Sequence, residues 1–136
     1  MSENRVLLDS SFWICLRDER ESNHASASAL ARDLVKERVR FVVTPLVFAE
    51  THAYFSRAAL RRQQILDDVE NNPIISCEPL FPADQTEAIR LLRQHKDKSY
   101  SLCDAISFVV MGRLGVRRVA SFDEHFRQFG EFEVIC

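Results

Sequence analysis

Glycine is scarce in this sequence, which has three glycines among its 136 residues. Walker A loops and dinucleotide-binding fingerprints need several glycines close together where a strand turns into a helix. Gly112, Gly115 and Gly130 do not supply such a cluster, so both kinds of nucleotide site are excluded. Long apolar runs are missing too: none approaches the roughly 20 residues that a membrane span requires. We therefore expect no membrane association.

Paired cysteines are also lacking. The sequence has four scattered cysteines and no C-x-x-C pair: Cys15, Cys77, Cys103 and Cys136. This spacing disfavours a structural zinc site and a disulfide framework, and it favours buried, reduced thiols. The first four residues lack the basic stretch and apolar core of a signal peptide. We expect a single cytoplasmic domain over residues 1–136.

Neither sign of charge dominates the composition. The chain has 18 Lys+Arg against 20 Asp+Glu and a formal net charge of −2. A protein that binds nucleic acid through its overall charge would be strongly basic. Nucleic-acid binding by this chain would therefore depend on a local patch of basic residues. With 46% hydrophobic residues, the chain can build a substantial core for one domain.

Short apolar runs alternate with segments of helical periodicity. Strands are expected at residues 5–8, 41–43, 73–77, 118–121 and 132–135. Helices are expected after Ser10 or Ser11, then at about 22–38, from 45 with a second stretch at 57–72, and at 84–94, 102–114 and 122–129. Ser10 or Ser11 is expected to cap the first helix, and Asp84 with Glu87 forms a capping-box pattern. This alternation predicts an α/β fold of three layers with a mostly parallel central sheet.

Two aspartates follow predicted strands. Asp9 ends the first strand and Asp123 comes two residues after the fourth. Ligands of open parallel sheets bind outside the carboxyl ends of the strands, which makes both residues candidates for a site. Each taken alone is more often a cap or turn residue.

Two further acids occur on predicted helices. Glu50 shares a helix face with the apolar residues 46, 47, 53 and 54, so we expect it to be buried and paired, protonated or bound to metal. Asp104 forms a capping box with Ser101, which alone could explain an acid there. The helix from 102 is apolar on most sides and is expected to cross the core, which would bring Asp104 near other buried ends.

Four segments, in this order, resemble the PIN domain: VLLDSS at 6–11, TPLVFAE at 44–50, LCDAI at 102–106 and SFD-x-x-F at 121–126. The likeness is greatest to the small VapC-type toxin ribonucleases. The resemblance implies a PIN-like fold of three α/β/α layers and a metal-dependent endoribonuclease that hydrolyses RNA phosphodiester bonds. It also implies a small antitoxin protein and a homodimer as partners.

The resemblance assigns site residues individually. Asp9, Glu50, Asp104 and Asp123 match the four acidic positions of the family. Asp9 and Asp104 are then the principal ligands of Mg²⁺ or Mn²⁺, while Glu50 and Asp123 complete a second or water-bridged site and orient the attacking water. Like charges this close need a cation, and hard cations prefer oxygen ligands.

Hydroxyl positions of the family lie beside the first and fourth acids. Ser10 or Ser11 matches the first of them, and Ser121 matches the second, where the family more often has Thr. If four acids bind a cation, the 16 that remain are outnumbered by 18 basic residues, which suits a protein that meets RNA.

Two other functions compete with the nuclease. A catalytically inactive PIN-like module for RNA binding or regulation is disfavoured because all four acids are present. A phosphoacceptor domain is disfavoured because Asp9 has no adjacent acid and position 11 is Ser. His52 and His125 each follow an acid by two residues. On a helix this spacing points Glu50 and His52 apart and disfavours shared metal binding, and His125, whose local structure the sequence defines less well, is disfavoured as a ligand too. The arginine clusters at 57–62 and 113–118 are expected to be mainly solvated.

Overall fold

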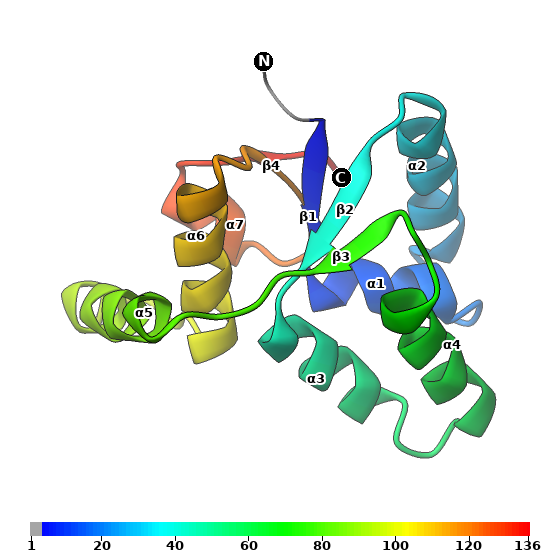
Figure 1. Cartoon of the computed structure of the whole chain (residues 1–136), viewed down its shortest axis with the longest axis horizontal. Helices are drawn as coiled ribbons and strands as arrows, with labels where there is room; N and C mark the ends of the chain where they lie inside the picture. Colours follow the sequence, from blue (N-terminus) through cyan, green and yellow to red (C-terminus); the bar gives the residue numbers. More distant parts are fainter. Residues whose placement is uncertain (1–3) are drawn as a thin grey trace.

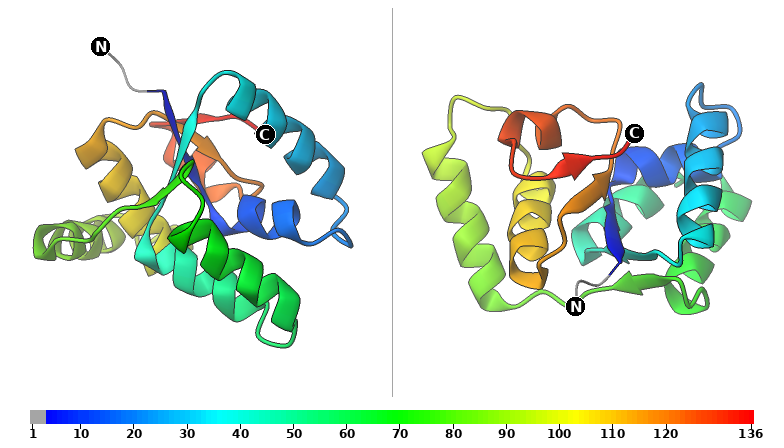
Figure 2. Two further views of the ribbon diagram at one scale, coloured as in Figure 1. Left: turned by 45° about the vertical axis from the view of Figure 1, so that its right-hand side comes forward. Right: turned by 90° about the horizontal axis from the view of Figure 1, so that it is seen from above.

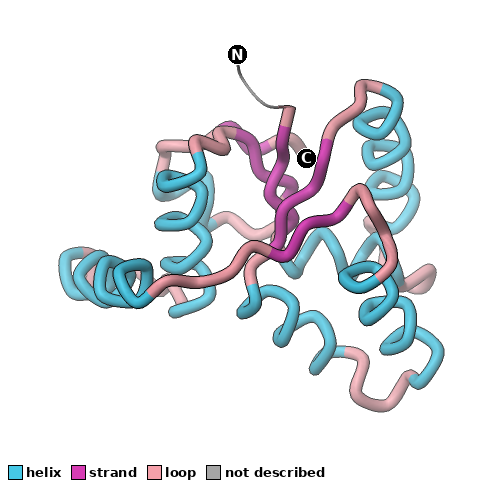
Figure 3. Tube along the Cα trace, in the orientation of Figure 1, coloured by secondary structure: helices cyan, strands magenta, loops and turns pink. Residues whose placement is uncertain are grey.

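The computed structural model describes residues 4–136. Residues 1–3, which carry part of the signal-peptide expectation, lie outside the described residues. These described residues form five strands and seven helices, whose arrangement is drawn in Figures 1 and 3. The strands are β1 (Arg5–Leu8), β2 (Arg40–Val43), β3 (Ile75–Cys77), β4 (Arg118–Ala120) and β5 (Glu133–Val134). The helices are α1 (Ser10–Arg17), α2 (His24–Lys36), α3 (Pro45–Tyr54), α4 (Ala59–Glu70), α5 (Pro82–Gln94), α6 (Leu102–Leu114) and α7 (His125–Phe129).

The sheet has the strand order β3-β2-β1-β4-β5, and every pairing is parallel. Helices α1–α4 lie on one side of it and α5–α7 on the other (Figure 2). The predicted three-layer α/β fold is therefore confirmed. A parallel sheet covered on both faces needs strands without polar interruptions, which explains the fully apolar run in the central strand β1.

Side chains of β1 alternate between two cores. Val6 and Leu8 pack with the residues under α1–α4, while Leu7 packs with those under α5 and α6. All three are completely buried. Because β1 is packed against a core on each face of the sheet, the residues that follow its carboxyl end are held in fixed positions.

Two helix starts differ from the expectation. The cap of α1 is Asp9, not Ser10 or Ser11, and it makes no side-chain capping hydrogen bond. Both serines lie inside the first turn, where their hydroxyls are directed to other partners. Helix α5 begins at Pro82, and Asp84 accepts a hydrogen bond from the Phe81 N–H at 2.9 Å. The expected capping box on Asp84 and Glu87 is therefore wrong, because the helix starts earlier.

Other helix ends follow the sequence signals. Thr44 caps α3 by accepting the N–H of Val47, and Pro45 follows as the first helical residue. Ser101 caps α6, and Gly115 ends it in the left-handed region at φ 72°. None of the helices among residues 4–136 is long and apolar enough to cross a membrane.

The cysteines are all free, as the spacing predicts. Their burial is only partly as expected. Cys15 is buried and Cys136 is exposed, while Cys77 and Cys103 are half-buried.

Candidate active site

The site begins where β1 and β4 end. Leu8 pairs with Ala120, and the Asp9 N–H continues the ladder by donating to the Ala120 carbonyl at 3.0 Å. Asp9 and Ser121 are therefore neighbours at the carboxyl edge of the sheet. The Ser121 hydroxyl donates to Asp9 Oδ2 at 2.8 Å, and the Ser11 hydroxyl donates to the same oxygen at 2.9 Å.

Asp9 is 4% exposed. Burial raises the pKa of its carboxyl to about 6, against the opposing effect of hydrogen bonds from Ser121 and Ser11. The negative charge of Asp104 raises this pKa further, which shows that the two acids are close in space. An ionised Asp9 is thus unfavourable at this edge of the sheet unless positive charge is added.

The two serine hydroxyls also organise the segment after β4. Ser121 Oγ accepts the Asp123 N–H at 3.0 Å, and Ser11 Oγ accepts the Phe122 N–H at 2.9 Å. Ser11, and not Ser10, is therefore the first-helix hydroxyl that contacts Asp9. Ser10 instead donates to Glu50 Oε1.

Asp104 both caps α6 and belongs to the site. Its Oδ2 accepts the Ser101 N–H at 2.9 Å, and its own N–H donates to the Ser101 hydroxyl at 3.0 Å. The same Oδ2 lies 2.7 Å from Nδ1 of His125. Asp104 Oδ1 receives no hydrogen bond from residues 4–136, so it is open to a ligand.

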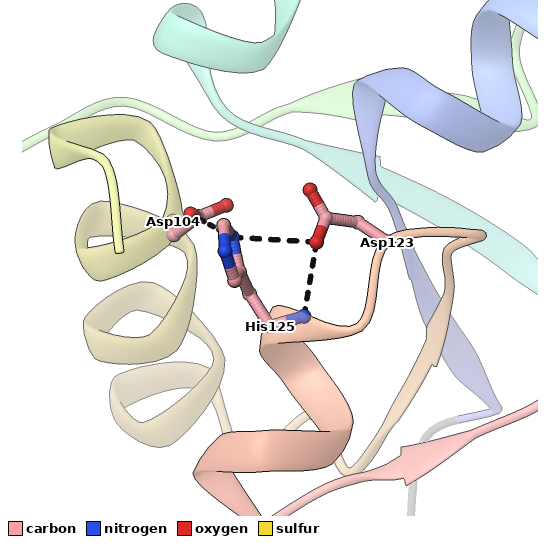
Figure 4. Close-up of side chains that lie close together, drawn as sticks. All are labelled: Asp104, Asp123 and His125. Atoms are coloured by element: carbon pink, nitrogen blue, oxygen red, sulfur yellow. Dashed lines mark hydrogen bonds and ion pairs between the residues drawn. The ribbon is translucent and has the colours of Figure 1, made fainter. Parts of the chain in front are cut away.

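Asp123 approaches Asp104 across the ring of His125 (Figure 4). Asp123 Oδ1 accepts the backbone N–H of His125 at 3.0 Å and lies 3.3 Å from its Nδ1. One ligand atom from each of these three residues lies within 4.8 Å of the others, a spacing that could hold a metal ion. Asp123 precedes α7 and only His125 lies in the helix, so the two side chains can approach each other although they are two residues apart.

Glu50 lies in a different environment from the one expected. It is exposed, and the residues that α3 buries are Val47 and Thr51. The expectation of a buried Glu50 is wrong because α3 packs through a stripe too narrow to include it. Its carboxylate still reaches the site, where it accepts from Ser10 and lies 4.0 Å from Cys103 Sγ.

Cys103 lies near the acids: its Sγ is 4.0 Å from Glu50 Oε1, and it directly precedes Asp104. Burial raises the pKa of its thiol well above the usual range, and the charges of Glu50, Asp9 and Asp104 raise it further. Asp123 joins them through Ser121 and His125. The four acids singled out from the sequence are therefore gathered at one edge of the sheet. Cys103 and His125 are the members that sequence reasoning missed or disfavoured; their positions beside two of the acids were the available signal.

Two arginines of each cluster make contacts within the protein, while Arg57 and Arg117 are exposed. Arg61 pairs with Glu19 at 2.8 Å, and Arg113 makes two hydrogen bonds with Asp84 at 2.9 Å. His52 on α3 is half-buried and is not part of the group of three metal-binding candidates.

Known proteins resemble this chain over nearly its whole length. A sequence model of the family described as "PIN domain" matches residues 6–131. The 23S rRNA-specific endonuclease VapC20 of Mycobacterium tuberculosis is 25% identical over 130 residues, which cover 95% of this chain and 97% of the relative.

The crystal structure of M. tuberculosis VapC20, described as a Sarcin-Ricin loop cleaving toxin, matches with a TM-score of 0.85 at 23% identity. The match covers 96% of this chain and 99% of that one, and at this identity it speaks for the fold alone. With the family model spanning nearly all of the sequence, this chain belongs to the PIN domain family.

Proposed function

We propose that this protein is a metal-dependent endoribonuclease that hydrolyses RNA phosphodiester bonds as the toxin of a VapBC-type toxin–antitoxin pair. The observation that carries the proposal is the convergence of four acids at the carboxyl edge of a PIN fold: Asp9, Glu50, Asp104 and Asp123. The similarity to a VapC-type endonuclease supports the same activity.

The donor set fits a hard divalent cation. The burial that raises the pKa of Asp9 to about 6 and the charge of the neighbouring Asp104 both disfavour an ionised pair without a cation. Carboxylate oxygens are the ligands that Mg²⁺ and Mn²⁺ prefer, and Asp104 Oδ1 has no competing donor among residues 4–136. We assign Asp9 and Asp104 as the principal ligands of Mg²⁺ or Mn²⁺.

The other residues of the site also have roles in the proposed hydrolysis. The bound cation supplies a Lewis acid that activates water and offsets the negative charge of the phosphate. Glu50, which is exposed, orients the attacking water by accepting its hydrogen. Asp123 completes the site next to Asp104, and Ser121 and Ser11 hold Asp9 by hydrogen bonds to its Oδ2.

The RNA needs cationic contacts outside the acid cluster. Exposed Lys96 and Lys98 come just before Ser99, whose hydroxyl lies 3.2 Å from Nε2 of His125. Lys98 directly precedes Ser99 and pairs with Asp97 at 3.8 Å, and we propose that it and Lys96 supply contacts to RNA phosphates. In keeping with the VapC-type likeness, we propose a small antitoxin and a second copy of this chain as protein partners, in the cytoplasm.

The inactive RNA-binding module is the weaker proposal. An RNA-binding module without catalysis would not need a carboxyl at position 9. Burial and the charge of Asp104 disfavour the ionised form of Asp9 there. No feature of the site favours it.

The direct test is cleavage of RNA by the purified protein with EDTA, Mg²⁺ or Mn²⁺. Ribosomal RNA is the first substrate to use, because 23S rRNA is the target in the relative's name; tRNA is included for comparison. We expect metal-dependent cleavage that Asp9→Asn and Asp104→Asn abolish while both variants stay folded. Asp33→Asn, on the exposed face of α2, is the matched control and should cleave normally. Equal activity in all three variants would show that the acid cluster is not the active site.

A further inference from the structure

His125 is the histidine that contacts two acids of the site. Its Nδ1 lies 2.7 Å from Asp104 Oδ2 and 3.3 Å from Asp123 Oδ1. Asp104 comes from the start of α6 and Asp123 from the turn after β4, so one imidazole connects two elements that are separate in sequence (Figure 4).

The ring of His125 is held from its other sides as well. It packs edge-on against buried Tyr100, with ring centroids 5.6 Å apart and an interplanar angle of 86°. The Ser99 hydroxyl lies 3.2 Å from its Nε2. A ring fixed in this way presents Nδ1 to the acids in one orientation.

The contact with Asp104 defines what Nδ1 does. When Asp104 is ionised, as a ligand of a cation must be, its carboxylate only accepts hydrogen bonds, and Nδ1 of His125 then carries the hydrogen in this contact. A nitrogen that is donating this hydrogen cannot bind a cation at the same time. The Ser101 N–H donates to the same Oδ2, which leaves the other oxygen of Asp104 without a donor from residues 4–136.

Asp123 shows the same division of its oxygens. Its Oδ1 faces both the backbone N–H and the Nδ1 of His125, and its Oδ2 receives no hydrogen bond from the described part of the chain. Each acid therefore has one oxygen held by His125 and one oxygen open.

We propose that His125 is a positioning residue of the cation site: it holds one oxygen of Asp104 and one of Asp123, and so directs their open oxygens at the cation. The inference rests on the proposed function, in which these acids bind Mg²⁺ or Mn²⁺. Residues that orient ligating carboxylates typically change metal affinity 10- to 100-fold when they are replaced.

The test is Mn²⁺ binding by the whole chain without RNA, measured from the electron paramagnetic resonance signal of free Mn²⁺. His125→Phe keeps a ring against Tyr100 but has no N–H, and we expect it to weaken Mn²⁺ binding about 10- to 100-fold. His125→Asn places an amide N–H near the position of Nδ1–H and should restore most of the affinity. His52→Phe is the matched control, and it should bind as the wild type does.

Pulsed electron paramagnetic resonance of the bound Mn²⁺ separates positioning from direct ligation. We expect no imidazole nitrogen coupling in the wild type. A coupling that His125→Asn removes would make His125 a ligand and overturn the inference. Unchanged Mn²⁺ affinity in His125→Phe, or equal weakness of folded His125→Phe and His125→Asn, would overturn it too.

The same measurements separate this inference from the proposed function. A wild type that binds Mn²⁺ and cleaves RNA, with His125→Phe binding equally well, removes only the role of His125. A wild type that shows the expected affinities but cleaves no RNA contradicts the nuclease and supports the role of His125. A wild type that binds no Mn²⁺ contradicts both.

Discussion

The buried carboxyl of Asp9 is expected to destabilise the cation-free protein at neutral pH. An unperturbed aspartate carboxyl has a pKa of 3.8, and burial is the main cause that raises the pKa of Asp9 to about 6 in the folded protein. The folded state therefore holds the proton more tightly than the unfolded state. The stability that this carboxyl contributes is fully present below pH 3.8 and is lost as the pH rises through 6. At 1.36 kcal/mol per pH unit, the loss is about 3 kcal/mol.

Asp9→Asn replaces this group with an amide that stays uncharged and can still accept from the hydroxyls of Ser11 and Ser121. In EDTA at pH 7.5, we expect the variant to be about 3 kcal/mol more stable than the wild type. The gain should fall to roughly half at pH 5 and vanish near pH 3.8. Urea unfolding followed by circular dichroism measures the difference, with the m-value unchanged. Added Mg²⁺ should then stabilise the wild type more than the variant.

Asp84→Asn is a control of opposite sign at another buried aspartate. Burial alone would raise the pKa of Asp84, but hydrogen bonds from Arg113 and the Phe81 N–H hold it below the usual range. This carboxyl stabilises the fold at neutral pH, and its contribution is lost as the pH falls. Asp84→Asn should therefore destabilise the protein at pH 7.5. If Asp9→Asn is no more stable than the wild type there, or keeps its advantage at pH 4, the account of Asp9 is wrong.

Three further substitutions, the last paired with a control variant, test other parts of the structure. Arg38→Gly should raise the unfolding free energy in urea by about 1 kcal/mol, because Arg38 has a φ of 64° that glycine adopts without a Cβ clash; an unchanged midpoint would contradict this. Asp68→Ala should cost about 3 kcal/mol and shift the fluorescence of the chain's one tryptophan, whose Nε1–H it accepts at 2.8 Å; a loss below 1 kcal/mol would contradict it. Ser121→Ala should lower RNA cleavage about 10- to 100-fold by freeing Asp9, whereas Ser107→Ala removes a buried hydroxyl without a partner among residues 4–136 and should leave cleavage unchanged; equal effects of the two would refute the role of Ser121.

The sequence predicted the element types well because their causes are local. Uninterrupted apolar runs indicate strands covered on both faces, and β1, β2 and β4 are such strands. Helix starts at Thr44 and Ser101 were also predictable, since a side chain caps each one. The starts of α1 and α5 were not, because no side chain of the cap residue marks them: Asp9 and Phe81 act there through their backbone conformation.

The candidate site shows where sequence reasoning ends. The order of the acids identified the family resemblance, but the choice between Ser10 and Ser11 depends on a rotation of about 100° around α1. That rotation is fixed only by the packing of the helix. Glu50 was misplaced because helical spacing gives the relative directions of side chains and not which face is covered. His125 was disfavoured because the sequence defines its local structure poorly; in the structure α7 begins at His125, and Asp123 lies in the turn before it.

Partners of the buried aspartates distinguish those with a structural role from those of the site. The described residues bury five aspartates: Asp9, Asp18, Asp68, Asp84 and Asp104. Three of them form ion pairs with an arginine: Asp18 with Arg20, Asp68 with Arg17 and Asp84 with Arg113. Within residues 4–136, the other two form no ion pair with an arginine or lysine, and hydroxyls, backbone N–H groups and one imidazole hold them instead. These two, Asp9 and Asp104, are the acids that the family resemblance assigns as principal ligands. Since burying a carboxylate is costly without positive charge nearby, the two that the protein leaves without an arginine or lysine are the two that a divalent cation would complete.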